Sequence, residues 1–354
     1  MQEFTYTANP GRVLFGDGKI AALAEEVSRL GLSRALVLST PQQESQARGV
    51  ADALGGLCAG LFAGAVMHTP VAVTEQALRV VRETGADGIV AFGGGSTIGL
   101  AKAIALRTDL PQIAVPTTYA GSEMTPILGE TEGGRKVTQS TSKVLPEVVI
   151  YDVALTLSLP PMLSGTSGIN AIAHAVEALY AQSRNPIISL IAAEGIGALA
   201  RALPRIAETP GDVAARSDAQ YGAWLCGTCL GAVGMALHHK LCHTLGGTFE
   251  LPHAETHTII LPHALAYNAP AVPDAIKRLR HALGADDPAT ALYDLAGAVG
   301  AARALRDLGM PEGGIDRAVD LAFANPYWNP RPLERDGIRN LLNRAWAGEP
   351  PQQG

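Results

Sequence analysis

Short, continuous apolar runs alternate with helix-like stretches over the first 150 residues. Runs such as ALVL at 35–38 and GIVAF at 88–92 carry no charged side chain on either face. Strands of this kind are buried on both faces, whereas strands that alternate apolar and polar residues meet water on one. The pattern predicts a parallel sheet covered by helices on both sides, with strands at 35–38, 88–92, 113–115 and 148–151.

After Pro160 the strand-like runs nearly vanish, and apolar positions recur at helical spacing. The sequence LTLSLPP at 155–161 marks the change. We therefore expect two domains: an α/β domain over residues 1–157 and an all-helical domain over 158–354. Helices are expected at 169–182, 187–202, 220–245, 274–283, 289–308 and 315–324.

Composition narrows the class of protein. Of the 354 residues 47% are hydrophobic and 17% charged, which is typical of a compact chain with a large core. A net charge of −6 without a basic stripe argues against a nucleic-acid partner. No signal pattern and no apolar run of membrane-spanning length stands out, so no membrane partner is expected. Four cysteines in this length fit a cytoplasmic location.

A glycine cluster follows one of the predicted strands. Gly93, Gly94, Gly95 and Ser96 stand between the strand GIVAF and the helix-like run TIGLAKAIAL. Glycines let a ligand approach the backbone, and a helix N-terminus offers free N–H groups to a phosphate. The cluster is neither G-x-G-x-x-G nor a P-loop, and a simple tight turn is the alternative.

Hydroxyl-bearing stretches follow two further strands. Thr117 and Thr118 lie in PTTYAGSE at 116–123, and Ser39 follows ALVL. Ends of parallel strands meet at the ligand crevice of such sheets, so these residues are candidates for cofactor binding. No carboxylate follows ALVL to repel a 2′-phosphate, and the cofactor is therefore expected to be NADH or NADPH.

Six of the nine histidines fall between 237 and 263. His239 and His243 are four apart and share a helix face, and Gly246 and Gly247 are expected to end that helix before His253. Such a cluster suits a metal or acid/base site, although polar residues at helix ends would give a similar pattern.

Together these motifs resemble the iron-containing alcohol dehydrogenase family, which also includes glycerol dehydrogenase and, more distantly, dehydroquinate synthase. The matching stretches are GGGS at 93–96, PTTYAGSE at 116–123, GINAIAHAVEA at 168–178 and the spacing H-x3-H-x9-H from His239 to His253. The resemblance implies a dinucleotide-binding α/β domain followed by a helical catalytic domain. It also places Lys136 near cofactor and substrate.

The resemblance implies a metal site with one substituted ligand. Family members bind the metal through an aspartate and three histidines, which correspond to Asn170, His174, His239 and His253. An amide oxygen is a much poorer ligand than a carboxylate for a divalent cation, although three histidines can hold zinc. We therefore expect no bound metal at this degenerate site.

Within the family, Asn170, the paired His238 and His239, NPRP at 329–332 and the opening FTYTANPGRVLFGDG resemble one branch. That resemblance implies reduction of the carbon–carbon double bond of maleylacetate to 3-oxoadipate during breakdown of aromatic compounds. This similarity makes His174, His239, His243 and His253 the candidate catalytic residues. The dicarboxylate substrate is then assigned to Asn170, Lys136, His257 and Arg331, the last through its guanidinium. The alternatives are a surface turn for Arg331, a solvated loop position for Lys136 and an ordinary helix position for His257. Glu177, three residues after His174, is a candidate acceptor for that ring, and a surface or capping role is the alternative.

Three other functions stay open on the sequence. A metal-dependent alcohol or polyol dehydrogenase with a degenerate ligand is the main alternative. A lyase of the dehydroquinate synthase type and a non-catalytic nucleotide-binding protein are the others. The resemblance also implies a homodimer, in which residues 3–6 could pair across a two-fold axis.

Overall fold

The computed structural model describes residues 3–9, 11–133 and 135–352. The chain divides into two compact units, one of residues 8–159 and the other of residues 160–354 together with residues 1–7. The sequence places the change of architecture at nearly the same point. The sequence does not indicate that the N-terminal segment groups with the helical unit. The expected α/β domain over residues 1–157 included this segment, and the observed division differs there.

The first unit is built on a six-stranded parallel sheet of order β1-β8-β5-β4-β2-β3. The predicted strands β2, β4, β5 and β8 form its centre and are buried throughout. The edge strands β1 and β3 were not predicted, because half-buried runs such as CAGLF give a weak apolar signal. The bounds are β1 (Arg12–Gly16), β2 (Ala35–Leu38), β3 (Cys58–Phe62), β4 (Gly88–Gly93), β5 (Gln112–Pro116) and β8 (Val148–Asp152).

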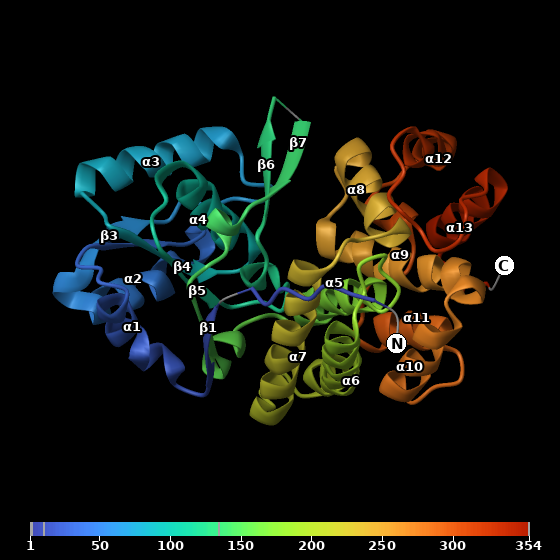
Figure 1. Ribbon diagram of the computed structural model, residues 1–354, viewed down its shortest axis with the longest axis horizontal. Coiled ribbons are helices and arrows are strands. Elements are labelled where there is room, and N and C mark those ends of the chain that lie inside the picture. Colours follow the sequence, from blue (N-terminus) through green and yellow to red (C-terminus); the bar gives the residue numbers. More distant parts are fainter. Residues whose placement is uncertain (1–2, 10, 134, 353–354) are drawn as a thin grey trace. The chain divides into compact units, whose positions relative to one another are not determined.

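Helices cover both faces of this sheet (Figure 1). Helices α1 (Leu23–Arg29) and α2 (Glu44–Leu54) pack their apolar side chains against one face, where Val37, Val90 and Val115 join the same buried cluster. Helices α3 (Val71–Thr84) and α4 (Gly95–Thr108) lie on the other. An antiparallel hairpin of β6 (Ile127–Glu132) and β7 (Arg135–Ser140) completes the unit.

The strand order reverses between β2 and β4. From β2 the chain passes outward to the edge strand β3, then returns to β4 on the other side of β2 and continues to β5. The loops that leave the carboxyl ends of β2 and β4 therefore turn in opposite directions. Open α/β sheets bind ligands at this kind of switch point, and the glycine cluster follows β4 there.

The second unit is helical, and no strand is assigned within its described residues. The predicted helix over 220–245 is wrong, because the chain breaks at 233–236 into two helices. The helix expected over 289–308 ends at Ala298. The helices are α5 (Pro161–Ala178), α6 (Pro186–Glu208), α7 (Val213–Ala232), α8 (Leu237–Phe249), α9 (His253–Asn268), α10 (Pro273–Leu283), α11 (Pro288–Ala298), α12 (Ile315–Ala324) and α13 (Arg335–Ala347).

Helix α8 does not end at its two glycines, which corrects the sequence-based expectation. Gly246 and Gly247 lie inside it, and the helix ends at Phe249, before Glu250 in the left-handed conformation. A helical glycine costs roughly 1 kcal/mol relative to alanine. Burial of Leu245 and partial burial of Phe249 in the core formed by α8, α9, α12 and α13 offset that cost.

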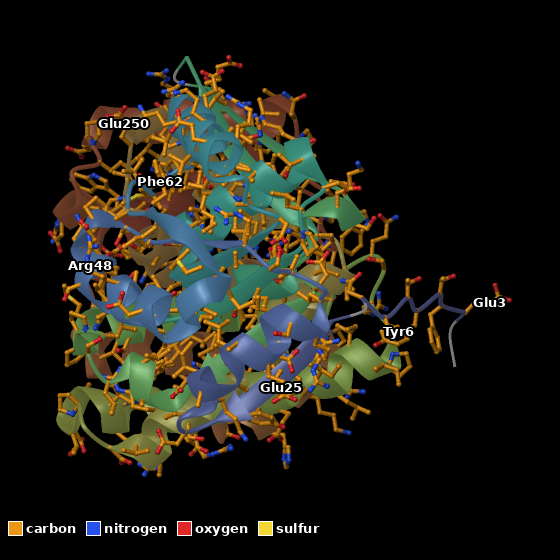
Figure 2. The ribbon with its side chains drawn as sticks, turned by 90° about the vertical axis from the view of Figure 1, so that its left-hand side faces the viewer. Glu3, Tyr6, Glu25, Arg48, Phe62 and Glu250 are labelled. Carbon is orange, nitrogen blue, oxygen red and sulfur yellow. The ribbon has the colours of Figure 1, made fainter. Side chains whose placement is uncertain are left out.

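Helix α6 and the N-terminal residues 3–7 are two further parts of the helical unit. Helix α6, with 23 residues, is long and apolar enough to cross a membrane by length and composition, but half of its most apolar window is buried inside the protein, as in the core helix of a globular unit. Residues 3–7 form no helix or strand, and Tyr6 on this segment is exposed (Figure 2).

Candidate functional site

The glycine cluster in the first unit forms a tight strand-to-helix turn. Gly93 ends β4 at a φ of 152°, and helix α4 begins at Gly95. A Cβ atom on Gly94 would lie 2.7 Å from Cγ2 of Thr118, so the backbone passes too close to the next loop for any side chain. At Gly95 a Cβ would meet no atom within 4 Å, and the residue is exposed. The first-turn N–H groups of α4 thus face an open, side-chain-free approach, as phosphate binding requires.

The hydroxyl-bearing residues that were predicted to bind the cofactor lie at the same edge of the sheet, but they differ in their exposure to solvent. The Thr117 hydroxyl accepts a hydrogen bond of 3.0 Å from Nε2 of Gln43, and Thr118 packs against Gly94. Ser39 is fully buried at this edge, and its hydroxyl has no hydrogen-bond partner among the described residues. Lys136 pairs with Thr131 in the hairpin, but its side chain lies outside the described part of the structure.

In the helical unit α5 presents three polar side chains on one face. Asn170, His174 and Glu177 follow at intervals of four and three residues, so a helix aligns them. All three are buried, with Glu177 fully so. Burial of a carboxylate is costly unless it is hydrogen-bonded.

Glu177 meets this need with three donors from the start of α8. Its carboxylate accepts hydrogen bonds from the backbone N–H groups of Ala236 (2.8 Å) and His238 (2.7 Å), and lies 2.7 Å from Nδ1 of His239. Of the two roles expected for Glu177, the structure shows the capping one: its carboxylate binds N–H groups at the N-terminus of α8 and pairs with His239, not His174. A carboxylate only accepts, so His239 carries its proton on Nδ1.

Five histidine rings, with His239 at their centre, gather within the helical unit. The ring centroids of His174, His257 and His243 lie 5.2, 5.0 and 6.0 Å from that of His239. His253 lies 4.3 Å from His257. The structure thus brings together all four histidines predicted to be catalytic, and His257 with them.

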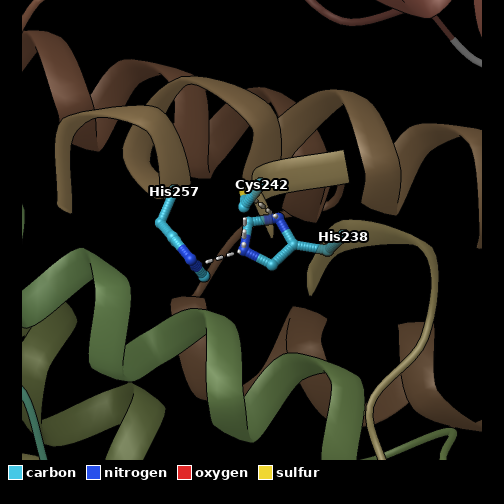
Figure 3. A group of neighbouring side chains, drawn as sticks. All are labelled: His238, Cys242 and His257. Carbon is cyan, nitrogen blue, oxygen red and sulfur yellow. Dashed lines mark hydrogen bonds between the residues drawn. The ribbon is translucent and has the colours of Figure 1, made fainter. Parts of the chain in front are cut away.

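Behind this group lies a second set formed by His238, Cys242 and His257 (Figure 3). Nε2 of His238 is 2.9 Å from Nδ1 of His257, and Sγ of Cys242 is 3.7 Å from the same Nε2. All three side chains are buried, and their potential ligand atoms lie within 4.8 Å of one another. The hydrogen bond between the rings fixes the orientation of His257.

Burial sets the charge of the cluster. The pKa values of His174, His238 and His257 are all held well below the usual histidine value, first by burial and then by the neighbouring histidines. These rings are neutral at neutral pH.

Several atoms of the cluster have no hydrogen-bond partner among the described residues although they are buried. They are Oδ1 of Asn170, Nδ1 of His174, Nε2 of His239 and Nε2 of His257. An unsatisfied buried polar atom is costly, so a group of such atoms indicates a ligand that completes their hydrogen bonds.

The donor set differs at one position from the metal site implied by the family resemblance. Asn170 supplies an amide in place of a carboxylate, and the nearby carboxylate of Glu177 is already committed to three N–H donors. Within the described part of the chain, the donors that converge to 4.8 Å are those of His238, Cys242 and His257, not the family set. Neutral imidazole nitrogens and an amide oxygen can accept hydrogen bonds from a polar substrate, and imidazole nitrogens can also bind a transition metal.

A tyrosine that the sequence did not reveal completes the exposed side of the cluster. The hydroxyl of Tyr327 lies 3.0 Å from Nδ1 of His243, and Nζ of Lys240 lies 5.8 Å from the centre of its ring. Tyr327 follows α12 in an irregular stretch, NPYWNP, 84 residues from His243. No periodicity or motif spacing links the two, so only the fold could show the contact.

Arg331 lies apart from the rings. Its Nη1 donates a hydrogen bond of 2.9 Å to the carbonyl of Tyr267, and its guanidinium stacks 4.3 Å from the centre of the Tyr267 ring. It lines a separate cavity near the C-terminal end of α9. The structure therefore does not bring Arg331 together with Asn170 and His257.

Comparison with known proteins agrees with this architecture. The model of the iron-containing alcohol dehydrogenases matches residues 10–153, and the model of the C-terminal part of that family matches residues 164–346. The chain belongs to the iron-containing alcohol dehydrogenase family. It is an oxidoreductase, and the predicted fold of an α/β domain followed by a helical domain is confirmed.

Named relatives cover nearly the whole chain. A maleylacetate reductase from Sphingobium indicum is 59% identical over 99% of both chains, and one from Rhizobium sp. is 57% identical over 99% of this chain and all of its own. The crystal structure of a maleylacetate reductase from Agrobacterium tumefaciens, 56% identical, matches with a TM-score of 0.96 over 99% of this chain and 100% of that chain.

Proposed function

We propose that this chain reduces the carbon–carbon double bond of maleylacetate to give 3-oxoadipate, with NADH or NADPH as the hydride donor. The observation that carries the proposal is identity of 51–59% to several maleylacetate reductases along almost the full chain. The open polar atoms of the histidine cluster support it, because they leave hydrogen bonds for a polar substrate to complete.

The cofactor belongs to the first unit. Its pyrophosphate meets the N-terminus of α4 at Gly95 and Ser96, where the backbone is accessible. Thr118 stands beside this turn as a hydroxyl donor, while Gln43 and Thr117 hold the neighbouring loops together. The buried Ser39 supports the loop after β2 and does not contact the cofactor.

The reaction needs a hydride, a stabilised oxyanion and a proton. The hydride adds to the alkene carbon β to the ketone, and the electron pair of the double bond moves to the ketone oxygen as an enolate. A proton then reaches the α carbon and restores the ketone. Hydrogen-bond donors near the ketone oxygen lower the barrier, because charge grows there in the transition state.

The histidine cluster supplies these donors. Glu177 holds the ring of His239, so that its unpartnered Nε2 points away from the carboxylate and toward the substrate. His257 is oriented by His238, which leaves its own Nε2 available. The amide of Asn170 binds the substrate on the same side. His243 and Tyr327, at the exposed rim, deliver the proton from solvent.

We further propose that no metal takes part. The substituted Asn170 leaves only neutral metal ligands, and the enolate is stabilised by hydrogen bonds from the histidine cluster instead. This assigns the polarising role of the family's metal to side chains of this chain.

The test is NADH oxidation with freshly made maleylacetate, before and after exhaustive chelation, with elemental analysis of the protein. Full activity in metal-free protein supports both proposals. Activity lost on chelation and restored by zinc or iron would keep the substrate and reject the metal-free mechanism. Turnover of simple alcohols or polyols, without maleylacetate reduction, would favour the metal-dependent dehydrogenase instead.

Replacing the amide by a carboxylate gives an independent test of the metal proposal. Asn170→Asp restores an anionic ligand beside His174, so the variant should retain about one equivalent of zinc after dialysis. Wild-type protein treated in parallel should retain much less. Equal zinc content in the two proteins would contradict the role assigned to Asn170.

A further inference from the structure

A second polar cluster surrounds a cavity of about 240 Å³ at the other end of α9. His263 lies ten residues after His253, roughly 15 Å along the helix axis. The cavity is therefore separate from the histidine cluster, although both use α9. The polar residues that line it are His263, Tyr267, Arg331, Asn340, Arg344 and Gln352.

Two guanidinium groups face this cavity in fixed positions. Arg331 is held by the carbonyl and the ring of Tyr267. Arg344 donates from Nε to the carbonyl of Pro350, at 2.9 Å, and from Nη1 to the side chain of Gln352. An arginine has five N–H donors, so each keeps some for a ligand. These hydrogen bonds to backbone carbonyls hold both guanidinium groups in place but do not neutralise their positive charge.

Carboxylates near the two arginines compensate their charge only weakly. Glu334 lies 3.8 Å from Arg331, and Glu349 lies 3.0 Å from Arg344. The side chains of these glutamates are 66% and 54% exposed. Exposed ion pairs of this kind contribute little, so an anion inside the cavity can compete with them.

His263 provides an independent sign of a ligand. It is 3% exposed, it lines the cavity, and its Nε2 has no hydrogen-bond partner among the described residues. Burial, together with the nearby charge of Arg344, lowers the pKa of His263 to about 4. The ring is therefore neutral at neutral pH and offers one N–H donor and one acceptor, one of them unused.

We infer that this cavity binds a small oxyanion between Arg331 and Arg344, with His263 and Asn340 completing its hydrogen bonds. The volume is below that of typical cofactor pockets of 300–1,000 Å³, so the ligand is a phosphate or a small carboxylate and not a nucleotide. Two guanidiniums and a neutral imidazole donor are the groups that recognise such anions.

The bound anion would touch elements that also build the histidine cluster. The side chain of Asn329 donates a hydrogen bond of 2.7 Å to the carbonyl of Arg331 and pairs with Asn268 at the end of α9. Its Oδ1 also accepts from the N–H of Leu237, the first residue of α8. The hydrogen bonds of Asn329 therefore connect Arg331 to the first turn of α8, the helix that carries His238 and His239.

The inference is tested by isothermal titration calorimetry with inorganic phosphate and, separately, with succinate, at ionic strength fixed by chloride. The variants are Arg344→Gln and His263→Gln. The matched control is Arg339→Gln, also on α13, whose guanidinium pairs with Asp316 and Asp336 at the surface. Circular dichroism confirms that each variant is folded.

We expect millimolar binding of at least one anion to wild type and to Arg339→Gln, weakened tenfold or more in Arg344→Gln and measurably in His263→Gln. Binding of phosphate alone or of succinate alone identifies the kind of oxyanion. A carboxylate can also bind at the histidine cluster, so only the signal lost in Arg344→Gln and kept in Arg339→Gln counts. Absence of such a signal for both anions would overturn the inference. None of these outcomes depends on maleylacetate reduction.

Discussion

At the scale of single residues, Glu177 organises the candidate site. It receives two backbone N–H groups at the start of α8 and the Nδ1–H of His239. Glutamine has the same shape, but its NH₂ group would face donors where the carboxylate accepts. Residues that orient a catalytic histidine typically contribute 10–100-fold to activity.

Glu177→Gln should therefore lower kcat for maleylacetate reduction roughly 10–100-fold, because His239 loses its fixed tautomer. The KM for NADH should change little, since cofactor binding is assigned to the other unit. The measurement is steady-state kinetics beside Glu194→Gln, an exposed glutamate on α6. A kcat within twofold of wild type would reject the positioning role.

His263 gives a prediction for pH-dependent stability. Its folded-state pKa of about 4 lies below the usual 6.5, because of burial and of Arg344. Between these values the unfolded chain binds more protons than the folded one, so stability contributed by neutral His263 is complete above pH 6.5 and falls as pH drops toward 4. From pH 7.5 to 5 the loss is about 2 kcal/mol.

The share of this loss that comes from His263 should be absent in His263→Gln, so the variant should lose about 2 kcal/mol less free energy of unfolding than wild type. Urea unfolding followed by tryptophan fluorescence measures it, because Trp224, Trp328 and Trp346 all belong to the helical unit. The buffers are amines with chloride as the counterion, because these contain no oxyanion that could bind in the cavity. If wild type and variant lose the same free energy of unfolding between the two pH values, His263 is not the group responsible.

The sequence revealed the residues of the site better than their partners. Spacing of four residues placed His239 and His243 together, and the family motif located Asn170 and His174. The spacing left two roles open for Glu177, and the capping contact to α8 overrides proximity along α5. Tyr327 could not be found, since it reaches His243 across 84 residues from a segment without regular structure.

At the scale of elements, the central strands were predicted because burial on both faces leaves a continuous apolar run, while the edge strands β1 and β3 carry weaker signals. The break before α8 was missed, since VGMA at 233–236 contains no proline and only one glycine. There the carboxylate of Glu177 decides the helix start through its bond to His238 N–H.

The N-terminus of α4 gives a prediction that separates ligand binding from folding. A methyl group at Gly95 meets no protein atom within 4 Å, so Gly95→Ala should leave the unfolding free energy unchanged or slightly higher. The same methyl would occupy the approach of the pyrophosphate, and the KM for NADH should rise at least about tenfold.

Gly49→Ala is the matched control, because Gly49 lies inside α2 and its added Cβ also meets nothing within 4 Å. It should raise stability by up to about 1 kcal/mol without changing the KM. An unchanged KM in Gly95→Ala would show that the cofactor phosphates do not lie at this turn.

At the scale of the whole molecule, the predicted homodimer is tied to the N-terminal segment. Phe4 and Tyr6 are 45% and 41% exposed, although large apolar side chains gain from burial. Residues 3–7 form no strand in the single chain, and their backbone groups are available to pair with a second copy across a two-fold axis. Two aromatic anchors are the kind of residue that dominates such interfaces.

We therefore expect size-exclusion chromatography with light scattering to give about 73 kDa for wild type, twice the chain mass of 36.7 kDa. Phe4→Ser combined with Tyr6→Ser should shift this value toward that of one chain at micromolar concentration. Leu190→Ser is the control, because Leu190 is 63% exposed on α6 and lies outside the segment. A dimer that survives the double change would place the interface elsewhere, and a monomeric wild type would refute the homodimer itself.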